Sequence, residues 1–290
     1  MCLVIGGLAL AGCPGAPPSP TAPTPVPVDP GICERFQQAF APVETSWSGS
    51  VDTCDPGMPS EALNAAIVEQ VRFVRELVDL PAARAIDPAG AAGCALLLEA
   101  NGALSHEPPP EWACWESGRA DAAGRSLLAT VAGPDAVRAF LIDPGNDLLG
   151  HRRWLLSDWV QGIAFASTDG FSCLDMDAPV TPGGGWTPWP PAGETPVPLL
   201  ELAQFDVDRT GWSIQSDTLD LTGTTVRLTW DGVEQILATT PLQGGLGSVY
   251  GVSFTPETLV PNGVTWTVEV LGAPEPITYS GRKVACQEPG

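Results

Sequence analysis

Basic side chains are scarce in this sequence. Thirteen Lys and Arg residues stand against thirty-four Asp and Glu residues, which gives a formal net charge of -21. A charge of this sign repels phosphate backbones and anionic lipid headgroups. The composition therefore excludes nucleic acid as a partner, and a solvated acidic exterior is a sufficient explanation for the charge.

Histidine is scarcer still, since the chain has only His106 and His151. Imidazole exchanges a proton near neutral pH and is a common metal ligand. A fold that brought these two residues together would create a single place for such chemistry. The sequence has no Gly-x-Ser-x-Gly elbow, and the glycines at 183–185 precede Trp186 rather than a helix. Neither a serine hydrolase nor a phosphate-binding loop is therefore indicated.

Long apolar runs are absent after residue 13, so no later segment has the length of a membrane-spanning helix. Residues 1–13 are apolar and end in Leu-Ala-Gly-Cys13, which resembles the bacterial lipobox, whose cysteine is acylated and becomes the mature amino terminus. A plain signal peptide or a buried N-terminal strand is the other interpretation. A signal peptide normally opens with a positive segment, which is not seen here, so we expect a start further upstream.

Residues 14–31 alternate Pro with small residues, a composition that stays extended and predicts a tether. We therefore expect an exported protein that is lipid-anchored at the bacterial cell envelope through Cys13, or secreted. Its contact with the membrane would be the lipid anchor alone.

Six cysteines remain once Cys2 and Cys13 are assigned to the export segment, and none forms a C-x-x-C metal pair. An even number in an exported chain predicts disulfide bonds. Six cysteines allow about fifteen connectivities. Proximity along the chain favours three pairs, which are Cys33 with Cys54, Cys94 with Cys114, and Cys173 with Cys286.

Residues 32–176 predict an α+β domain in which helices precede strands. Hydrophobic spacing and capping residues predict helices from the N-cap Ser60 to about residue 80, over 87–101, over 121–128 and over 133–143. Alternation typical of strands follows at 162–166 and 171–176. This order favours helices that cover a small antiparallel sheet.

Roughly residues 59–176 resemble the CAP superfamily, which includes the cysteine-rich secretory proteins, the plant pathogenesis-related proteins and the insect venom allergens, and in particular its bacterial secreted branch. The resemblance rests on the helix pattern, Leu-Ser-His at 104–106, a short Ala-Val-x-x-aromatic helix, Gly-His-Arg at 150–152 and a Gly-Ile-Ala strand. It implies an α-β-α sandwich with a shallow cavity, where two histidines and two acidic residues can bind a divalent metal.

His106 and His151 match the two histidines of that family, and Asp143 falls where its second acid is expected. The family's Gly-Glu-Asn is replaced here by Gly124-Arg125-Ser126. An arginine cannot be a metal ligand, and its charge opposes a nearby cation. The resemblance therefore implies an incomplete metal site.

His106, His151 and Asp143 are thus the candidate cavity residues and the candidate ligands of Zn²⁺ or another divalent metal. Two imidazoles and a carboxylate are the minimum for a zinc centre with an open position for water. In the competing interpretation, His151 bonds to backbone and holds the loop before Trp154, while His106 caps the preceding helix or packs in the cleft. Of the two arginines that follow His151, one is expected to pair with Asp143 or Asp147 and the other to face solvent.

Residues 177–204 are dense in Pro, Gly and Trp and predict a linker. Short alternating segments after it predict an antiparallel β-sandwich of about seven strands over residues 205–290. Asp231-Gly232 marks one hairpin turn in this part. Bacterial proteins of the CAP superfamily often resemble this arrangement.

These features predict a surface-exposed CAP-domain lipoprotein that binds an extracellular ligand through its cavity or its β-sandwich. The resemblance implies a lipid, a cell-wall component or a protein as the ligand, and the residues do not select among them. The main alternative is a metal-assisted hydrolase that uses His106, His151 and Asp143 with water as the nucleophile. A structural coat or adhesion protein is a third interpretation.

Overall fold

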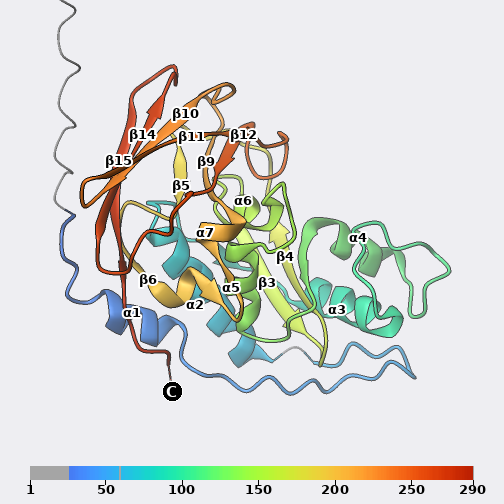
Figure 1. Ribbon diagram of the computed structural model, residues 1–290. Coiled ribbons are helices and arrows are strands. Elements are labelled where there is room, and N and C mark those ends of the chain that lie inside the picture. The colour runs from blue at the N-terminus through green and yellow to red at the C-terminus, as the bar shows by residue number, and fades with distance from the viewer. Residues whose placement is uncertain (1–25, 59, 290) are drawn as a thin grey trace, which may run out of the picture.

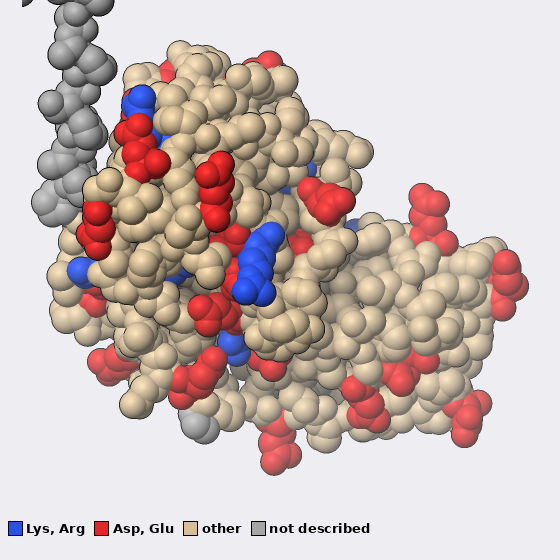
Figure 2. Space-filling model, viewed as in Figure 1, with Lys and Arg blue, Asp and Glu red and all other residues tan. Residues whose placement is uncertain are grey.

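The computed structural model describes residues 26–58 and 60–289 (Figure 1). The predicted signal segment, the lipidation site Cys13 and the tether up to residue 25 lie outside the described residues. Within them the chain combines helices with several antiparallel sheets, which confirms the α+β class. Figure 2 shows acidic side chains spread over one face with few basic ones among them.

The helices are α1 (Ile32–Ala39), α2 (Glu61–Glu76), α3 (Ala89–Asn101), α4 (Ser117–Arg125), α5 (Asp135–Ile142), α6 (Gly150–Leu155), the 3-10 helix η1 (Val197–Leu199) and α7 (Val207–Thr210). The strands are β1 (Arg84–Ala85), β2 (Ser126–Ala129), β3 (Gly162–Ser167), β4 (Ser172–Asp177), β5 (Thr187–Trp189), β6 (Gly193–Pro196), β7 (Glu201–Leu202), β8 (Phe205–Asp206), β9 (Trp212–Ser216), β10 (Thr225–Trp230), β11 (Val233–Ala238), β12 (Thr240–Pro241), β13 (Tyr250–Phe254), β14 (Thr265–Leu271) and β15 (Ile277–Val284).

The N-terminal half is built on a four-stranded sheet with the order β1-β3-β4-β2. Strand β4 is antiparallel to β3 and β2, and β1 is parallel to β3. One face, with Leu127 and Phe165, packs in a core with α2 and α5, while Leu128 and Cys173 pack on the other face with α3 and α4. Helices therefore cover both faces of the sheet (Figure 1).

Local signals place the helices of this half. The Ser60 side chain accepts a hydrogen bond from the Leu63 N–H and caps α2, as predicted. Gly102 ends α3 with a positive φ of 59°, which glycine adopts without steric cost. Helix α5 also lies where the sequence predicts it, and Asp143 at its C-terminus has a φ of 53°.

The predicted helix over 121–128 is wrong in its extent. Helix α4 ends at Arg125, and Leu127 and Leu128 lie in β2, where they pair with Leu174 and Cys173 of β4. Because Leu127 and Leu128 are both buried, one on each face of the sheet, β2 shows no alternation of apolar and polar residues. Such a strand cannot be told from the end of a helix by periodicity.

The C-terminal half is a β-sandwich with one sheet of order β11-β10-β14-β15-β6 and a second of order β12-β13-β9-β5. Asp231 and Gly232, with φ of 43° and 78°, form the predicted hairpin turn between β10 and β11. Inward residues of both sheets, such as Val226 and Trp212, share one core. The alternation seen in the sequence thus corresponds to real strands.

The segment predicted to be a linker contributes two strands to this sandwich. β5 pairs with β9, and β6 pairs with β15 in parallel. Trp189 and Thr195 of these strands are buried. The structure therefore differs from the prediction over 177–204, because proline and tryptophan enter edge strands here instead of marking a loop.

Two buried arginines join the halves of the chain. Arg152 donates to the carbonyls of Leu141 and Gly211, and Arg153 donates to Gln243 O at 2.6 Å and to Ser248 Oγ at 2.8 Å. Both side chains are fully buried. The prediction that one pairs with a carboxylate and the other faces solvent is wrong, because both are buried and donate to carbonyls of α5 and of the sandwich and to the Ser248 hydroxyl.

Three disulfides connect the six predicted cysteines, but not in the predicted pairs. The bonds are Cys33–Cys286, Cys54–Cys114 and Cys94–Cys173. Proximity in sequence misled the pairing, because Cys94 of α3 packs over β4 and α1 lies beside the end of the chain. Disulfides indicate an oxidising compartment. Within the described ranges, no helix has the length and apolar character needed to cross a bilayer.

Candidate functional site

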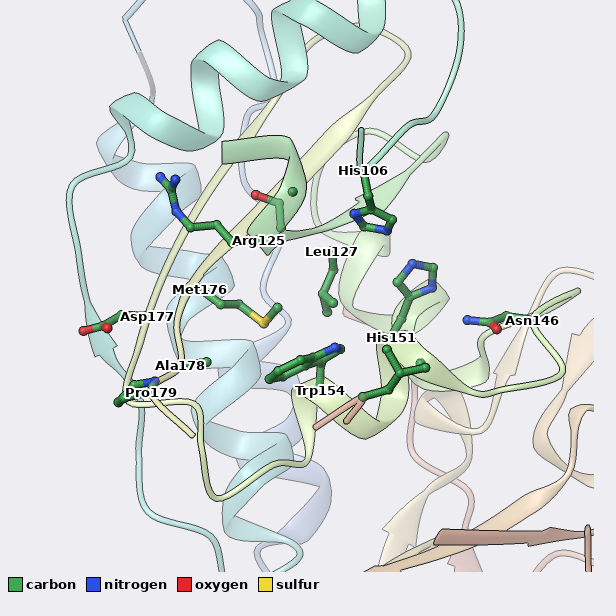
Figure 3. Close-up of a pocket in the computed structure, with 14 residues that line it drawn as sticks. His106, Arg125, Leu127, Asn146, His151, Trp154, Met176, Asp177, Ala178 and Pro179 are labelled. Atoms are coloured by element: carbon green, nitrogen blue, oxygen red, sulfur yellow. The ribbon is translucent and has the colours of Figure 1, made fainter. Parts of the chain in front are cut away.

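His106 and His151 line one cavity of about 790 Å³, which lies at the edge of the N-terminal sheet. The two rings face one another across it (Figure 3). His106 lies in the loop between α3 and α4, and His151 lies in the first turn of α6. The fold therefore brings together the two histidines of the chain, as predicted from the sequence.

The ring of His151 is held by a buried carboxylate. Nδ1 of His151 lies 2.7 Å from Oδ1 of Asp143, whose side chain is 2% exposed. Oδ2 of Asp143 also accepts the backbone N–H groups of His151 at 2.9 Å and Arg152 at 3.3 Å. Asp143 thus satisfies donors in the first turn of α6 and fixes the imidazole on the same helix. The Phe140 ring packs against the imidazole with centroids 5.4 Å apart.

The ring of His106 is held by backbone. Its Nδ1 lies 3.0 Å from the carbonyl oxygen of Ala123 in α4. A carbonyl oxygen only accepts, so Nδ1 of His106 carries the proton in this contact. In His151, too, Nδ1 donates, because the carboxylate of Asp143 is an acceptor. The Nε2 atoms are the ring nitrogens left for a ligand, and a neutral imidazole presents an acceptor there.

Asp143 does not line the cavity, in contrast to the sequence prediction. It lies behind His151 with both oxygens engaged by hydrogen bonds. No group of three or more His, Cys, Asp or Glu side chains in the described part of the chain is placed to hold a metal ion. The residues present therefore do not fit the predicted centre of His106, His151 and Asp143, because the carboxylate positions an imidazole instead of facing the cavity.

Arg125 lines the same cavity, at the position where the resemblance expects an acid. Its Nε and Nη2 lie 2.7 and 2.8 Å from the two carboxylate oxygens of Asp175 on β4. The Asp175 side chain is buried, while about half of the Arg125 side chain is exposed. The guanidinium is therefore held on the sheet side by a buried carboxylate, and in Figure 3 it points away from the two imidazoles.

The remaining wall is largely apolar. Leu127 of β2, Trp154 of α6 and Met176 of β4 come from the N-terminal half, and Leu246 comes from the loop between β12 and β13 of the sandwich. None of these four residues was predicted from the sequence to line a cavity. No local motif marks them, because they come together only when both halves pack.

The arrangement combines two fixed imidazoles with a largely apolar wall. It suits a ligand with a polar head and an apolar body, since apolar pockets with a few oriented polar groups bind such molecules. The imidazole and carboxylate of His151 and Asp143 also have the geometry of an oriented general base. Comparison with family models, with curated proteins and with solved structures found no match to this chain.

Proposed function

We propose that this chain is an exported CAP-like protein that binds a small amphipathic molecule, a lipid or a cell-wall component, in the cavity between His106 and His151. The observation that carries the proposal is the meeting of these two distant side chains on one cavity, each with Nδ1 already engaged. The sheet covered by helices on both faces supports the CAP-like part of the proposal. The disulfides support export, and acylation at Cys13 would keep the protein at the envelope.

The chemistry of the lining defines the ligand. The Nε2 atoms of His106 and His151 accept hydrogen bonds from hydroxyl or amine groups when the rings are neutral. Trp154 and Leu246 offer apolar surface for a hydrocarbon or ring body. The cavity volume of about 790 Å³ suits a small molecule rather than a folded partner.

Replacing both His106 and His151 by alanine is expected to reduce ligand binding about tenfold or more, because each imidazole contributes about 1 kcal/mol through its hydrogen bond. The purified full chain is incubated with lipid and muropeptide extracts of a bacterial envelope and re-isolated. The bound molecules are then extracted and quantified by mass spectrometry. Wild-type protein should retain a defined species that the double variant retains poorly.

Ile236→Ala is the matched control, because this exposed side chain lies on β11 of the sandwich, away from the cavity-lining residues. It should retain the wild-type amount of bound species. Equal retention by all three proteins would show that the cavity is not the binding site. If only the Ile236→Ala control lost the bound species, the binding site would lie on the sandwich.

A second function is favoured by the contact between His151 and Asp143. A buried carboxylate that orients an imidazole is the arrangement of a general base, which can activate water for hydrolysis. Ser126 lines the cavity but donates its hydroxyl to the Ala122 carbonyl at 2.7 Å, so water is the available nucleophile. We expect this activity only if the ligand carries an ester or amide within reach of His151.

The hydrolase alternative predicts turnover of p-nitrophenyl butyrate that falls at least about a hundredfold in His151→Ala. The measured quantity is kcat/KM after subtraction of the rate given by an equal concentration of free imidazole. The His106→Ala variant keeps the Asp143–His151 pair, so its kcat/KM should fall less than that of His151→Ala. Activity that is absent in the wild type, or unchanged in His151→Ala, would exclude His151 as a general base for such esters.

A further inference from the structure

Lys283 is the only lysine among the thirteen basic residues of the chain. It lies on β15, the last strand, and its side chain is 8% exposed. Its Nζ lies 2.5 Å from Oδ2 of Asp208 in α7, whose side chain is 5% exposed. The one primary amine among the side chains is therefore buried directly against a carboxyl group.

The choice of lysine at this position matters chemically. Arg75, Arg152 and Arg153 show that the chain uses arginine for buried cations that donate to carbonyls. A guanidinium is a poor nucleophile, whereas a lysine amine can attack a carbonyl or carboxyl carbon. Lys283 thus differs from these three buried arginines, because its amine can act as a nucleophile.

The carboxyl group of Asp208 is placed where such an amine can attack it. Its second oxygen, Oδ1, accepts a hydrogen bond from Nε1 of Trp212 at 2.8 Å. This donor would stabilise negative charge that develops on Oδ1 when an amine attacks the carboxyl carbon. The forms that react are the neutral amine and the neutral acid, and transfer of one proton from Nζ to Oδ2 within the 2.5 Å contact produces both.

The geometry points to a covalent amide bond between Nζ of Lys283 and Cγ of Asp208. The neutral amine attacks Cγ, the Nζ–Cγ bond forms, and the Cγ–Oδ2 bond breaks. Oδ2 leaves as water with the acid proton and one amine proton, and the second amine proton stays on the amide nitrogen. No oxidant, reductant or cofactor is needed, since the reaction is a condensation.

A cavity of about 240 Å³ beside the pair gives the leaving water a route out. Lys283 and Asp208 both line it, together with the carboxylates of Asp206 and Glu201. A water molecule in this cavity can relay the amine proton to one of these carboxylates and then to the leaving oxygen. The cavity thus supplies both a proton acceptor and an exit.

The bond would join the two sheets of the sandwich. Asp208 lies in α7, the short helix before β9 of one sheet, and Lys283 lies on β15 of the other. Cys286, just after Lys283, is already bonded to Cys33 in α1. The amide would add a second covalent tie at the end of the chain, and this tie would resist reduction.

Tryptic mapping of the reduced and denatured full chain tests the proposal. Trypsin cuts after arginine and free lysine, so the amide should appear as residues 283–290 joined to residues 154–209, with the summed mass lower by one water molecule. Amine-reactive labelling of the denatured protein should leave Lys283 unmodified. A released peptide that starts at Val284, together with a labelled Lys283, would overturn the proposal.

Two variants sharpen the result. Lys283→Arg should give only unbranched peptides, which shows that the branch depends on the amine. Asp208→Asn should still form the branch with loss of ammonia, and its branched product has the same formula as that of the wild type. A wild type that gives the same unbranched map as Lys283→Arg would establish an ordinary ion pair.

Discussion

Replacing Arg152 by alanine is expected to lower the free energy of unfolding by about 3–5 kcal/mol. The guanidinium donates to the carbonyls of Leu141, Ile142 and Gly211, and alanine leaves these buried acceptors without a donor. Burial lowers the pKa of Arg152 to about 10, opposed by the charge of Asp143, which shows that the ion is desolvated and depends on its acceptors. Urea denaturation with the disulfides intact, followed by tryptophan fluorescence, measures the loss.

Arg209→Ala is the control for this experiment. Arg209 pairs with Asp206 on the surface, and its side chain is 68% exposed. Exposed pairs contribute about 0–1 kcal/mol, so this variant should remain close to the wild type. Equal losses in the two variants would contradict the proposed role of Arg152 as a buried link between the halves.

Removing the Cys33–Cys286 disulfide, with both cysteines changed to alanine, is expected to cost about 5 kcal/mol, because the bond closes a very long loop. Its sequence separation is 253 residues, so the unfolded chain gains much freedom when it is lost. The C-terminal segment and α1 would separate first. The measurement is again the free energy of unfolding in urea, with the other two disulfides verified by mass.

The Cys54–Cys114 bond provides the comparison. Its separation is 60 residues, and the same loop-closure argument gives about 4 kcal/mol. The variant without Cys33–Cys286 should therefore be the less stable of the two. A smaller loss for the terminal bond than for Cys54–Cys114 would show that native contacts, rather than chain entropy, determine the cost.

Local chemistry made several elements predictable. Some signals depend only on residues that are close together in the sequence. They are the Ser60 cap and the apolar stripe of α2, the glycine at 102 after α3, and the Asp231-Gly232 hairpin. Such elements need no distant partner to be recognised. They were therefore accessible from the sequence.

Elements that depend on distant partners were not predictable. β2 is a strand because β4 lies beside it, and β5 and β6 are strands because β9 and β15 offer free edges. The buried positions of Arg152 and Arg153 depend on carbonyls of the sandwich. In each case the decisive hydrogen bond joins residues far apart in the sequence.

The sequence by itself determined the small set of groups with special chemistry, because composition limits the chain to two histidines and six cysteines after the apolar start. Only the tertiary structure decided how they are used. It turned Asp143 behind His151 instead of into the cavity, and it placed Leu246 of the sandwich on the cavity wall. The reason is physical: a residue type sets what a side chain can do, but packing across long sequence distances sets which groups it meets.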